Sequence, residues 1–259
     1  MTGDTRTGRF DPGGSTVGRE ASSRLPTQLR DIAVTMDYVP HAEGSALLSW
    51  GGTVVLATVT IEAKLPPHLR SAGHKGGWLT AEYALLPRST TVRAPRERLH
   101  AGGRTHEIQR LIGRALRSTV DLDLFKGKTI TVDVDVLLAD GGTRCAGIVA
   151  GYAALHQAAD RLVYKGDLAE WPLRHEVGAV SVGIGGGTVL LDLDFAEDSS
   201  AEADLNVVAT AAGEIVEVQG AGEGSPVPAE SYVALVATGV EGVKRVLEII
   251  RPQLAGAAS

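Results

Sequence analysis

The chain has 259 residues, with 44% hydrophobic residues, 22% charged residues and a formal net charge of -6. These values are typical of a globular protein with a substantial core, in one large domain or two small ones. The single cysteine, Cys145, excludes an intrachain disulfide and a zinc site built on a CxxC pair.

Residues 1–26 are rich in Gly, Ser, Thr, Asp and Arg without hydrophobic periodicity, so we expect a flexible tail there. The remaining residues, 27–259, are expected to form a single folded domain. The N-terminal segment lacks the apolar run of a secretory signal, and no stretch is apolar enough to span a membrane. Together with the low cysteine content, which suits a reducing compartment, these features predict a cytoplasmic protein without a membrane partner.

The first part of the folded region reads as strands followed by two helices. Alternating and β-branched residues predict strands within 30–62, at 78–86 and at 129–138. Apolar residues at helical spacing predict a helix over 104–119, and a second helix is expected over 145–163. The second helix is rich in Ala and Gly, which favours close packing against a sheet.

The second part repeats the mixture of strands and helix. Its predicted elements are strands at 179–184, 189–195, 205–209 and 214–219, and a helix over 228–254. The order of elements indicates an α/β (α+β) protein with two related halves packed together, at about 28–163 and 176–255, although no internal sequence repeat is evident.

Residues 88–117 are strongly basic, with eight arginines against two glutamates. Four of these arginines lie in a loop between a predicted strand and a predicted helix: Arg88, Arg93, Arg96 and Arg98. A long charged loop between ordered elements is commonly functional, whereas a solvated basic loop is the structural alternative. The arginines of the following helix, at 110, 114 and 117, lie off its apolar stripe, and exposed or interface charges are their simpler interpretation.

Two segments have the features of an anion site. Arg104 begins the first predicted helix behind two glycines, where free backbone N–H groups and the helix dipole favour anions. In ADGGTR (139–144), a strand leads through a Gly-Gly turn into a helix, so that Gly142 allows close approach of a phosphate and Thr143 and Arg144 supply donors. Because the segment matches neither GxxxxGKS nor GxGxxG, it indicates an anion site and no particular nucleotide.

Residues 192–210 contain six carboxylates and no Lys or Arg. Asp198 is expected in a short polar connection, and Asp204 on the next strand, on the face that also carries Asn206. Neighbouring strands would then place Asp198 and Asp204 side by side, where their repulsion would be relieved by Mg²⁺ or Mn²⁺, cations that prefer oxygen ligands. The alternative is a solvated acidic loop.

Several long segments together resemble the ribonuclease PH family of phosphate-dependent 3′-exoribonucleases. They are HAEGS (41–45), GWLTAEYALLPRST (77–90), GGRTHEIQRLIGRALR (102–117), ADGGTR (139–144), EDSSAEADLNVV (197–208) and EVQGAGEG (217–224). The resemblance runs from about residue 30 to the C-terminal helix. It implies the family's fold, similar to domain 2 of ribosomal protein S5, and a homohexameric ring built as a trimer of dimers.

The resemblance also implies the reaction and its residues. Inorganic phosphate would attack the last phosphodiester of RNA, chiefly the 3′ end of precursor tRNA and also ribosomal RNA, and release a nucleoside diphosphate in a reversible nucleotidyl transfer. Positions matching the family's phosphate site are Arg104, Gly142, Thr143 and Arg144, and those matching its catalytic, Mg²⁺- or Mn²⁺-associated carboxylates are Asp198 and Asp204. Positions matching its RNA-binding loop are Arg88, Arg93, Arg96 and Arg98.

Three classes of function remain open from the residues: a phosphorolytic nuclease, a metal-dependent hydrolytic nuclease, and a non-catalytic RNA-binding ring subunit. Two arginines at a phosphate site favour the first class over the second, because water as a nucleophile needs no anion receptor. The intact pair Asp198 and Asp204 favours it over the third. One departure from the family is Cys145, where another small residue, often Thr, is expected; it should pack as a small hydrophobe.

Overall fold

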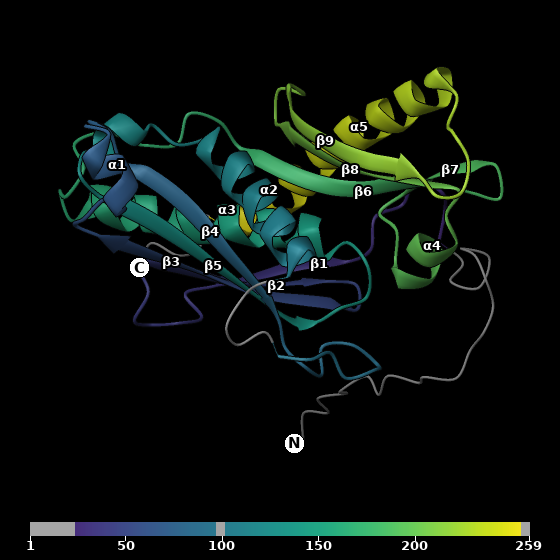
Figure 1. The fold of residues 1–259 in the computed structure, drawn as a ribbon, viewed down its shortest axis with the longest axis horizontal. Helices are drawn as coiled ribbons and strands as arrows, with labels where there is room; N and C mark the ends of the chain where they lie inside the picture. Colours follow the sequence, from purple (N-terminus) through teal and green to yellow (C-terminus); the bar gives the residue numbers. More distant parts are fainter. Residues whose placement is uncertain (1–23, 97–101, 255–259) are drawn as a thin grey trace.

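The computed structural model describes residues 24–96 and 102–254, which form two β-sheets with helices between and outside them (Figure 1). Most of the tail expected at 1–26 lies outside the described residues. Its last residues contact the folded chain, because the Leu191 N–H donates to the Pro26 carbonyl (2.8 Å) and Arg24 forms an ion pair with Glu197 (2.6 Å). Within the described ranges, no helix is long and apolar enough to cross a membrane.

The first sheet has the strand order β1-β2-β3-β5-β4, with β4 and β5 parallel and the other neighbours antiparallel. Its strands are β1 (Ile32–Met36), β2 (Gly44–Trp50), β3 (Thr53–Glu62), β4 (Trp78–Leu85) and β5 (Thr129–Leu138). Side chains alternate between the two faces of a strand, so Ala57 on β3 and its partner Val134 on β5 share the buried face. The strands expected within 30–62, at 78–86 and at 129–138 are confirmed.

The second sheet is antiparallel with the order β7-β6-β8-β9. Its strands are β6 (Val177–Gly185), β7 (Thr188–Leu191), β8 (Ala203–Thr210) and β9 (Ile215–Gly222). The first seven residues of β6 are buried without alternation, because helices contact this strand from both faces of the sheet. Asp204 and Asn206 lie two residues apart on β8 and so share one face, as expected.

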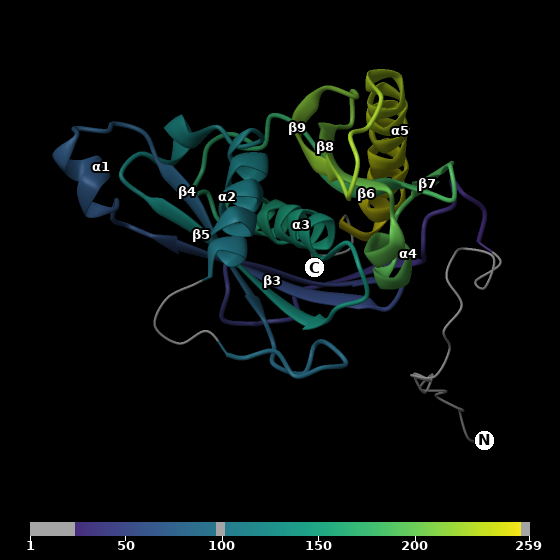
Figure 2. The same cartoon turned by 45° about the vertical axis from the view of Figure 1, so that its right-hand side comes forward.

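Helix α3 (Thr143–Tyr164) lies between the two sheets and contacts both (Figure 2). Helix α2 (Gly103–Arg117) packs beside it on β4, and α5 (Ala229–Leu254) covers the outer face of the second sheet. The small residues of α3 permit this close packing, since a Cβ atom at Gly147 would lie 3.2 Å from side chains of both Ile112 and Val134. The architecture confirms the expected fold class of two α/β halves packed together.

Three short helices complete the described chain: α1 (Pro67–Ser71), the 3₁₀ helix η2 (Leu122–Phe125) and α4 (Phe195–Ser200). The last of these corrects two expectations. The strand predicted over 189–195 ends at Leu191, where Asp192 adopts a left-handed conformation (φ 62°). The polar connection expected around Asp198 is the helix α4, which Asp194 and Glu197 start with a capping box.

Candidate active site

The turn between β5 and α3 is built on two glycines in the left-handed region, Gly141 (φ 75°) and Gly142 (φ 66°). Thr53 holds the turn, because its Oγ1 donates to the Gly141 carbonyl (2.7 Å) and accepts from the Asp140 N–H (2.9 Å). Gly142 is the N-cap residue of α3, and no side chain of the described residues caps this helix end. The first N–H groups of α3 are therefore available to an anion.

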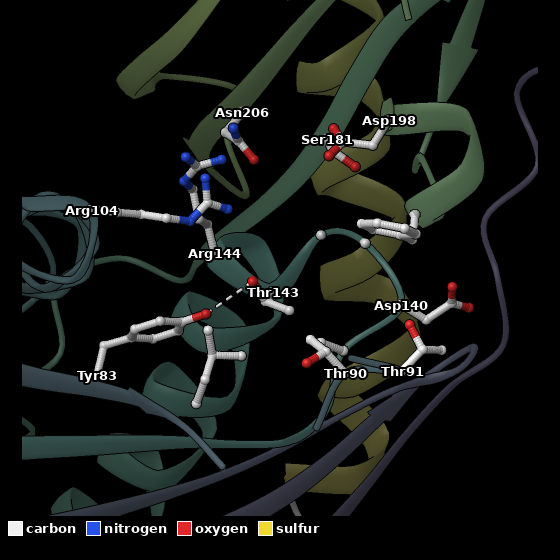
Figure 3. Close-up of a pocket in the computed structure, with 15 residues that line it drawn as sticks. Tyr83, Thr90, Thr91, Arg104, Asp140, Thr143, Arg144, Ser181, Asp198 and Asn206 are labelled. Atoms are coloured by element: carbon white, nitrogen blue, oxygen red, sulfur yellow. Dashed lines mark hydrogen bonds between the residues drawn. The ribbon is translucent and has the colours of Figure 1, made fainter. Parts of the chain in front are cut away.

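Two arginines come to this turn from different helices. Arg144 is half-buried in the first turn of α3, and Arg104 is exposed in the first turn of α2. Figure 3 shows both guanidinium groups directed into the same space above the turn. The Nε of Arg144 is buried and has no hydrogen-bond partner in the described part of the chain. A buried donor without a partner is unfavourable, so this atom fits an anion that the protein binds.

Asp198 on α4 and Asp204 on β8 lie at the same site. Burial raises the pKa of Asp204, and the neighbouring carboxylates of Asp198 and Glu223 raise it further. Burial is also the main cause that raises the pKa of Asp198, which Arg144 and Arg104 oppose. The expectation that the two aspartates meet is confirmed, although a helix and a strand bring them together and not two neighbouring strands.

Two cavities adjoin at these residues, and both are lined by Arg104, Arg144, Asp198 and Asn206. The first, of about 220 Å³, extends along the Gly-Gly turn toward Tyr83 and Phe195. The second, of about 360 Å³, is more polar and extends toward Asp204 and Glu223. The arginines and Asp198 therefore stand between a space at the helix N-terminus and a space at the acidic residues.

The acidic stretch divides into two groups with different surroundings. Asp192 and Glu197 are buried (1% and 4% exposed) and form ion pairs with arginines from the start of the described chain. Asp198 and Asp204 line the second cavity. The alternative of a solvated acidic loop is therefore wrong for the buried pair.

Tyr83 and Glu223 are site residues that the sequence reasoning missed. The Tyr83 hydroxyl donates to Thr143 Oγ1 (3.0 Å), and burial raises the pKa of Tyr83 although Arg104 and Arg144 act against it. Glu223 lines the second cavity. Both residues stand within segments that resemble the family, which is the signal that could have identified them.

The described arginines of the basic loop lie outside the two cavities. Arg88, Arg93 and Arg96 are exposed, and none of the three lines either cavity, whereas Thr90 and Thr91 line the first. Arg98 lies outside the described residues. The structure therefore places an exposed basic surface next to the candidate site.

Two further arginines of α2 have contacts of their own. Arg114 forms an ion pair with Glu217 on β9. Arg117 stacks on the Trp78 ring (4.9 Å to its centroid) and donates to the Leu79 carbonyl (3.0 Å). For these two arginines, a structural role is the supported interpretation.

Asp198 and Asp204 suit a metal ion that also takes ligands from the substrate. No group of three or more His, Cys, Asp or Glu side chains that could hold a metal occurs among residues 24–96 and 102–254. Mg²⁺ is commonly held by one or two carboxylates together with water and phosphate oxygens, so Asp198 and Asp204 fit such a site. The fold and the site thus define a two-half α/β protein that places an anion receptor beside a carboxylate pair.

Residues 28–159 match the model of the 3′ exoribonuclease family, domain 1, and residues 175–242 match domain 2 of the same family. The chain belongs to this family of phosphorolytic 3′-5′ exoribonucleases. A Deinococcus radiodurans protein named Ribonuclease PH is 54% identical over 238 residues, which cover 92% of this chain and 94% of that protein.

Solved structures show the same fold. Rice (Oryza sativa) Rrp46 superposes with a TM-score of 0.72 at 23% identity, covering 90% of this chain and 99% of that one. A chain of the Archaeoglobus fulgidus exosome with RNA bound to the active site has a TM-score of 0.73 at 22% identity, covering 88% of this chain and 91% of that one. In both cases the similarity is in the arrangement of the two sheets and their helices.

Proposed function

We propose that this protein degrades RNA from its 3′ end by using inorganic phosphate, bound between Arg104 and the turn formed by Gly142, Thr143 and Arg144. The observation that carries the proposal is the buried, unpartnered Nε of Arg144 at an uncapped helix N-terminus. A guanidinium group and helix N–H groups together form a receptor for a small dianion.

The chemistry follows from this placement. A phosphate oxygen forms a bond to the phosphorus of the last phosphodiester, and the bond from that phosphorus to the 3′ oxygen of the preceding nucleotide breaks. The leaving oxygen takes a proton, so the products are a nucleoside diphosphate and RNA shortened by one nucleotide. Arg104 and Arg144 orient the entering phosphate and reduce its repulsion from the RNA.

Asp198 and Asp204 are the residues that would hold a divalent cation, which we propose to be Mg²⁺ or Mn²⁺. Such an ion supplies positive charge to the phosphate group at which the bond changes occur. The electrostatics support this role, because burial raises the pKa of both carboxylates and repulsion from Asp198 and Glu223 raises the pKa of Asp204 further; a cation relieves that repulsion.

The proposed substrate is the 3′ end of precursor tRNA, with ribosomal RNA as a further substrate, held in part by Arg88, Arg93, Arg96 and Arg98. We further propose a homohexamer, a trimer of dimers, and a single domain over 27–259 with halves at 28–163 and 176–255. The family membership and the exposed basic loop support these proposals. The cytoplasmic location stays a prediction based on cysteine content.

One assay tests the proposed function. RNA labelled throughout is incubated with the protein and Mg²⁺, with and without phosphate, and the released nucleotides are separated. We expect nucleoside diphosphates, and only when phosphate is present. Equal shortening in phosphate-free buffer with release of monophosphates would show a hydrolase, and RNA binding without any product would show a non-catalytic subunit. Reversal by added nucleoside diphosphates, which lengthens the RNA, is the matching positive control.

A further inference from the structure

A buried ion pair lies behind the Gly-Gly turn, and the proposed reaction makes no direct use of it. The Asp192 carboxylate, from the second half of the chain, accepts hydrogen bonds from the backbone N–H of Arg30 (2.7 Å), the Arg30 Nη2 (2.7 Å) and the Trp50 Nε1 (2.9 Å). Arg24 approaches the same carboxylate at 3.4 Å. Asp192 therefore links the end of β7 to the first sheet.

The same arginine reaches the turn that carries the phosphate site. Arg30 Nη1 donates to the Asp140 carbonyl, and a Cβ atom at Gly142 would lie 3.1 Å from Arg30 Nη2. Thr53 holds the next peptide groups of the turn from the other side through the Asp140 N–H and the Gly141 carbonyl. The backbone from Asp140 to Gly142 is thus held by two side chains that do not themselves line the cavities.

Asp192 also belongs to the segment that leads into α4. Its N–H donates to the Ser181 carbonyl (2.7 Å), and the next N–H, of Leu193, donates to Ser181 Oγ (3.0 Å). Asp194 then caps α4, which carries Asp198. This segment contacts the turn directly, because a Cβ atom at Gly141 would lie 2.7 Å from the Leu193 carbonyl oxygen.

The arrangement is unfavourable in itself. A non-glycine residue in the left-handed region is strained, and a buried ion pair contributes little to stability because both charges lose their hydration. Such features are commonly retained where a functional geometry depends on them.

We infer that Asp192, Arg30 and Thr53 are positioning residues that hold the phosphate-binding turn and the helix bearing Asp198 at a fixed distance from each other. The inference depends on the proposed function, since it assigns these residues to the turn at which phosphate binds. Thr53 and Arg30 contact the turn, whereas Asp192 acts on the turn through Arg30. The side-chain bonds of Asp192 to Arg30 and Trp50 also hold the segment that leads into α4. We therefore expect substitutions of Thr53 and Asp192 to change different kinetic constants.

Thr53→Val tests the contact with the turn, because it keeps the shape of the side chain and removes both hydrogen bonds. The matched control is Thr129→Val, at the opposite end of β5, where a similarly buried Thr donates one hydrogen bond to the Lys64 carbonyl (2.6 Å). We expect Thr53→Val to raise the KM for phosphate roughly three- to tenfold, with the KM for RNA within about twofold of wild type. Thr53→Ser, which restores the hydroxyl, should restore the KM.

Asp192→Asn tests the link between the phosphate-binding turn and the segment that leads into α4. It should raise the KM for phosphate and also lower kcat, by roughly tenfold or more, because small displacements of reacting groups have large effects on rate. Thermal unfolding with and without phosphate provides a readout that does not need turnover: phosphate should raise the Tm of wild type and Thr129→Val more than that of Asp192→Asn. If Asp192→Asn does not fold, Thr53→Val and its Ser rescue still test whether phosphate binding depends on the side chains that hold the turn.

The outcomes separate this inference from the function on which it depends. If wild type neither needs phosphate for turnover nor gains Tm from it, the proposed function is wrong. If wild type needs phosphate but Thr53→Val has the phosphate KM of Thr129→Val, the function stands and the positioning role of Thr53 is refuted. Native kcat and phosphate KM in Asp192→Asn would refute the role of Asp192 in the same way.

Discussion

At the scale of single residues, the site combines groups that each have an unfavourable environment in the absence of ligands. Arg144 has a buried donor without a partner among the described residues. Burial raises the pKa of both Asp198 and Asp204, and repulsion from Asp198 and Glu223 raises the pKa of Asp204 further. Phosphate and a divalent cation would each relieve one of these. One substitution at each of these two sites tests this interpretation.

The first concerns Arg144→Ala. Loss of one charge-assisted contact should raise the phosphate concentration for half-maximal rate by roughly ten- to a hundredfold, with a smaller effect on RNA affinity. Addition of nucleotides from diphosphates should weaken in parallel, because the terminal phosphate uses the same receptor. Steady-state kinetics in both directions measure this effect. The control is Arg251→Ala, because the Arg251 guanidinium pairs with Glu176 and neither residue lines the two cavities. An unchanged phosphate dependence would place the phosphate elsewhere.

The second concerns Asp204→Asn. It should lower turnover by about 100-fold or more while RNA binding stays nearly unchanged, because the carboxylate serves the bond-making step. It should also stabilise the metal-free protein at neutral pH. A raised pKa means that the folded state binds the proton more tightly than the unfolded state, so stability falls as pH rises from the ordinary Asp value, about 4, through the raised pKa.

Denaturation in EDTA across pH 4 to 7 measures this difference in stability between wild type and Asp204→Asn. We expect a small difference, because Asp204 is only half-buried and solvent screens its charge. Asp121→Asn is a control of opposite sign, because its hydrogen bond to Arg174 lowers the pKa of Asp121, so that its contribution is lost as pH falls. Loss of stability at neutral pH in Asp204→Asn would contradict the expected electrostatics.

At the scale of elements, the basic loop after β4 and the helix α4 show two ways in which short segments serve the site. The loop contributes Thr90 and Thr91 to the first cavity and presents Arg88, Arg93 and Arg96 to solvent. Helix α4 uses a capping box at Asp194 to begin, and this places Asp198 over the second cavity. In both cases, residues adjacent in sequence have separate roles in structure and in binding.

The loop yields a prediction for RNA. Arg93→Ala combined with Arg96→Ala should weaken long tRNA substrates more than short oligonucleotides, and the salt dependence of binding should fall because fewer phosphates are neutralised. Binding measured across a series of salt concentrations tests this. The control removes two exposed arginines that form ion pairs elsewhere, Arg174 and Arg251. An unchanged salt slope in the loop variant would show that the loop does not contact RNA.

At the scale of the whole molecule, the site is shared between the halves. The turn and α2 belong to the first half, the two aspartates belong to the second, and α3 packs against both sheets. In one subunit, the described part of the basic loop presents three exposed arginines, Arg88, Arg93 and Arg96. A ring would bring several such loops to one entrance, which is the physical advantage of the proposed hexamer.

The prediction at this scale is that light scattering finds a hexamer at working concentration and that activity on tRNA precursors falls when dilution dissociates it. Activity on a short oligonucleotide, which needs fewer phosphate contacts, should fall less and serves as the control. A fully active monomer would exclude the ring as a requirement.

Sequence alone determined those features that depend on neighbours in the chain. Period-two alternation predicted the strands of both sheets, a helical stripe predicted α2, and the Gly-Gly segment before Thr143 predicted an anion-binding turn, since backbone conformation and side-chain period are local properties. It also placed Asp204 and Asn206 on one face. The capping box at Asp194 was present in the sequence as well, but the alternating residues before it suggested a longer strand.

The tertiary structure alone decided which carboxylates of the acidic stretch are buried in ion pairs and which face the cavity. Asp192 and Asp198 are close in sequence, but Asp192 meets Arg30, which stands more than half the chain away, while Asp198 meets Arg144 and Arg104. The contact of Tyr83 with Thr143 depends likewise on the pairing of β4 with β5 and on the packing of α3. The charge state and role of an ionisable group depend on what surrounds it in space, and local pattern does not contain that information.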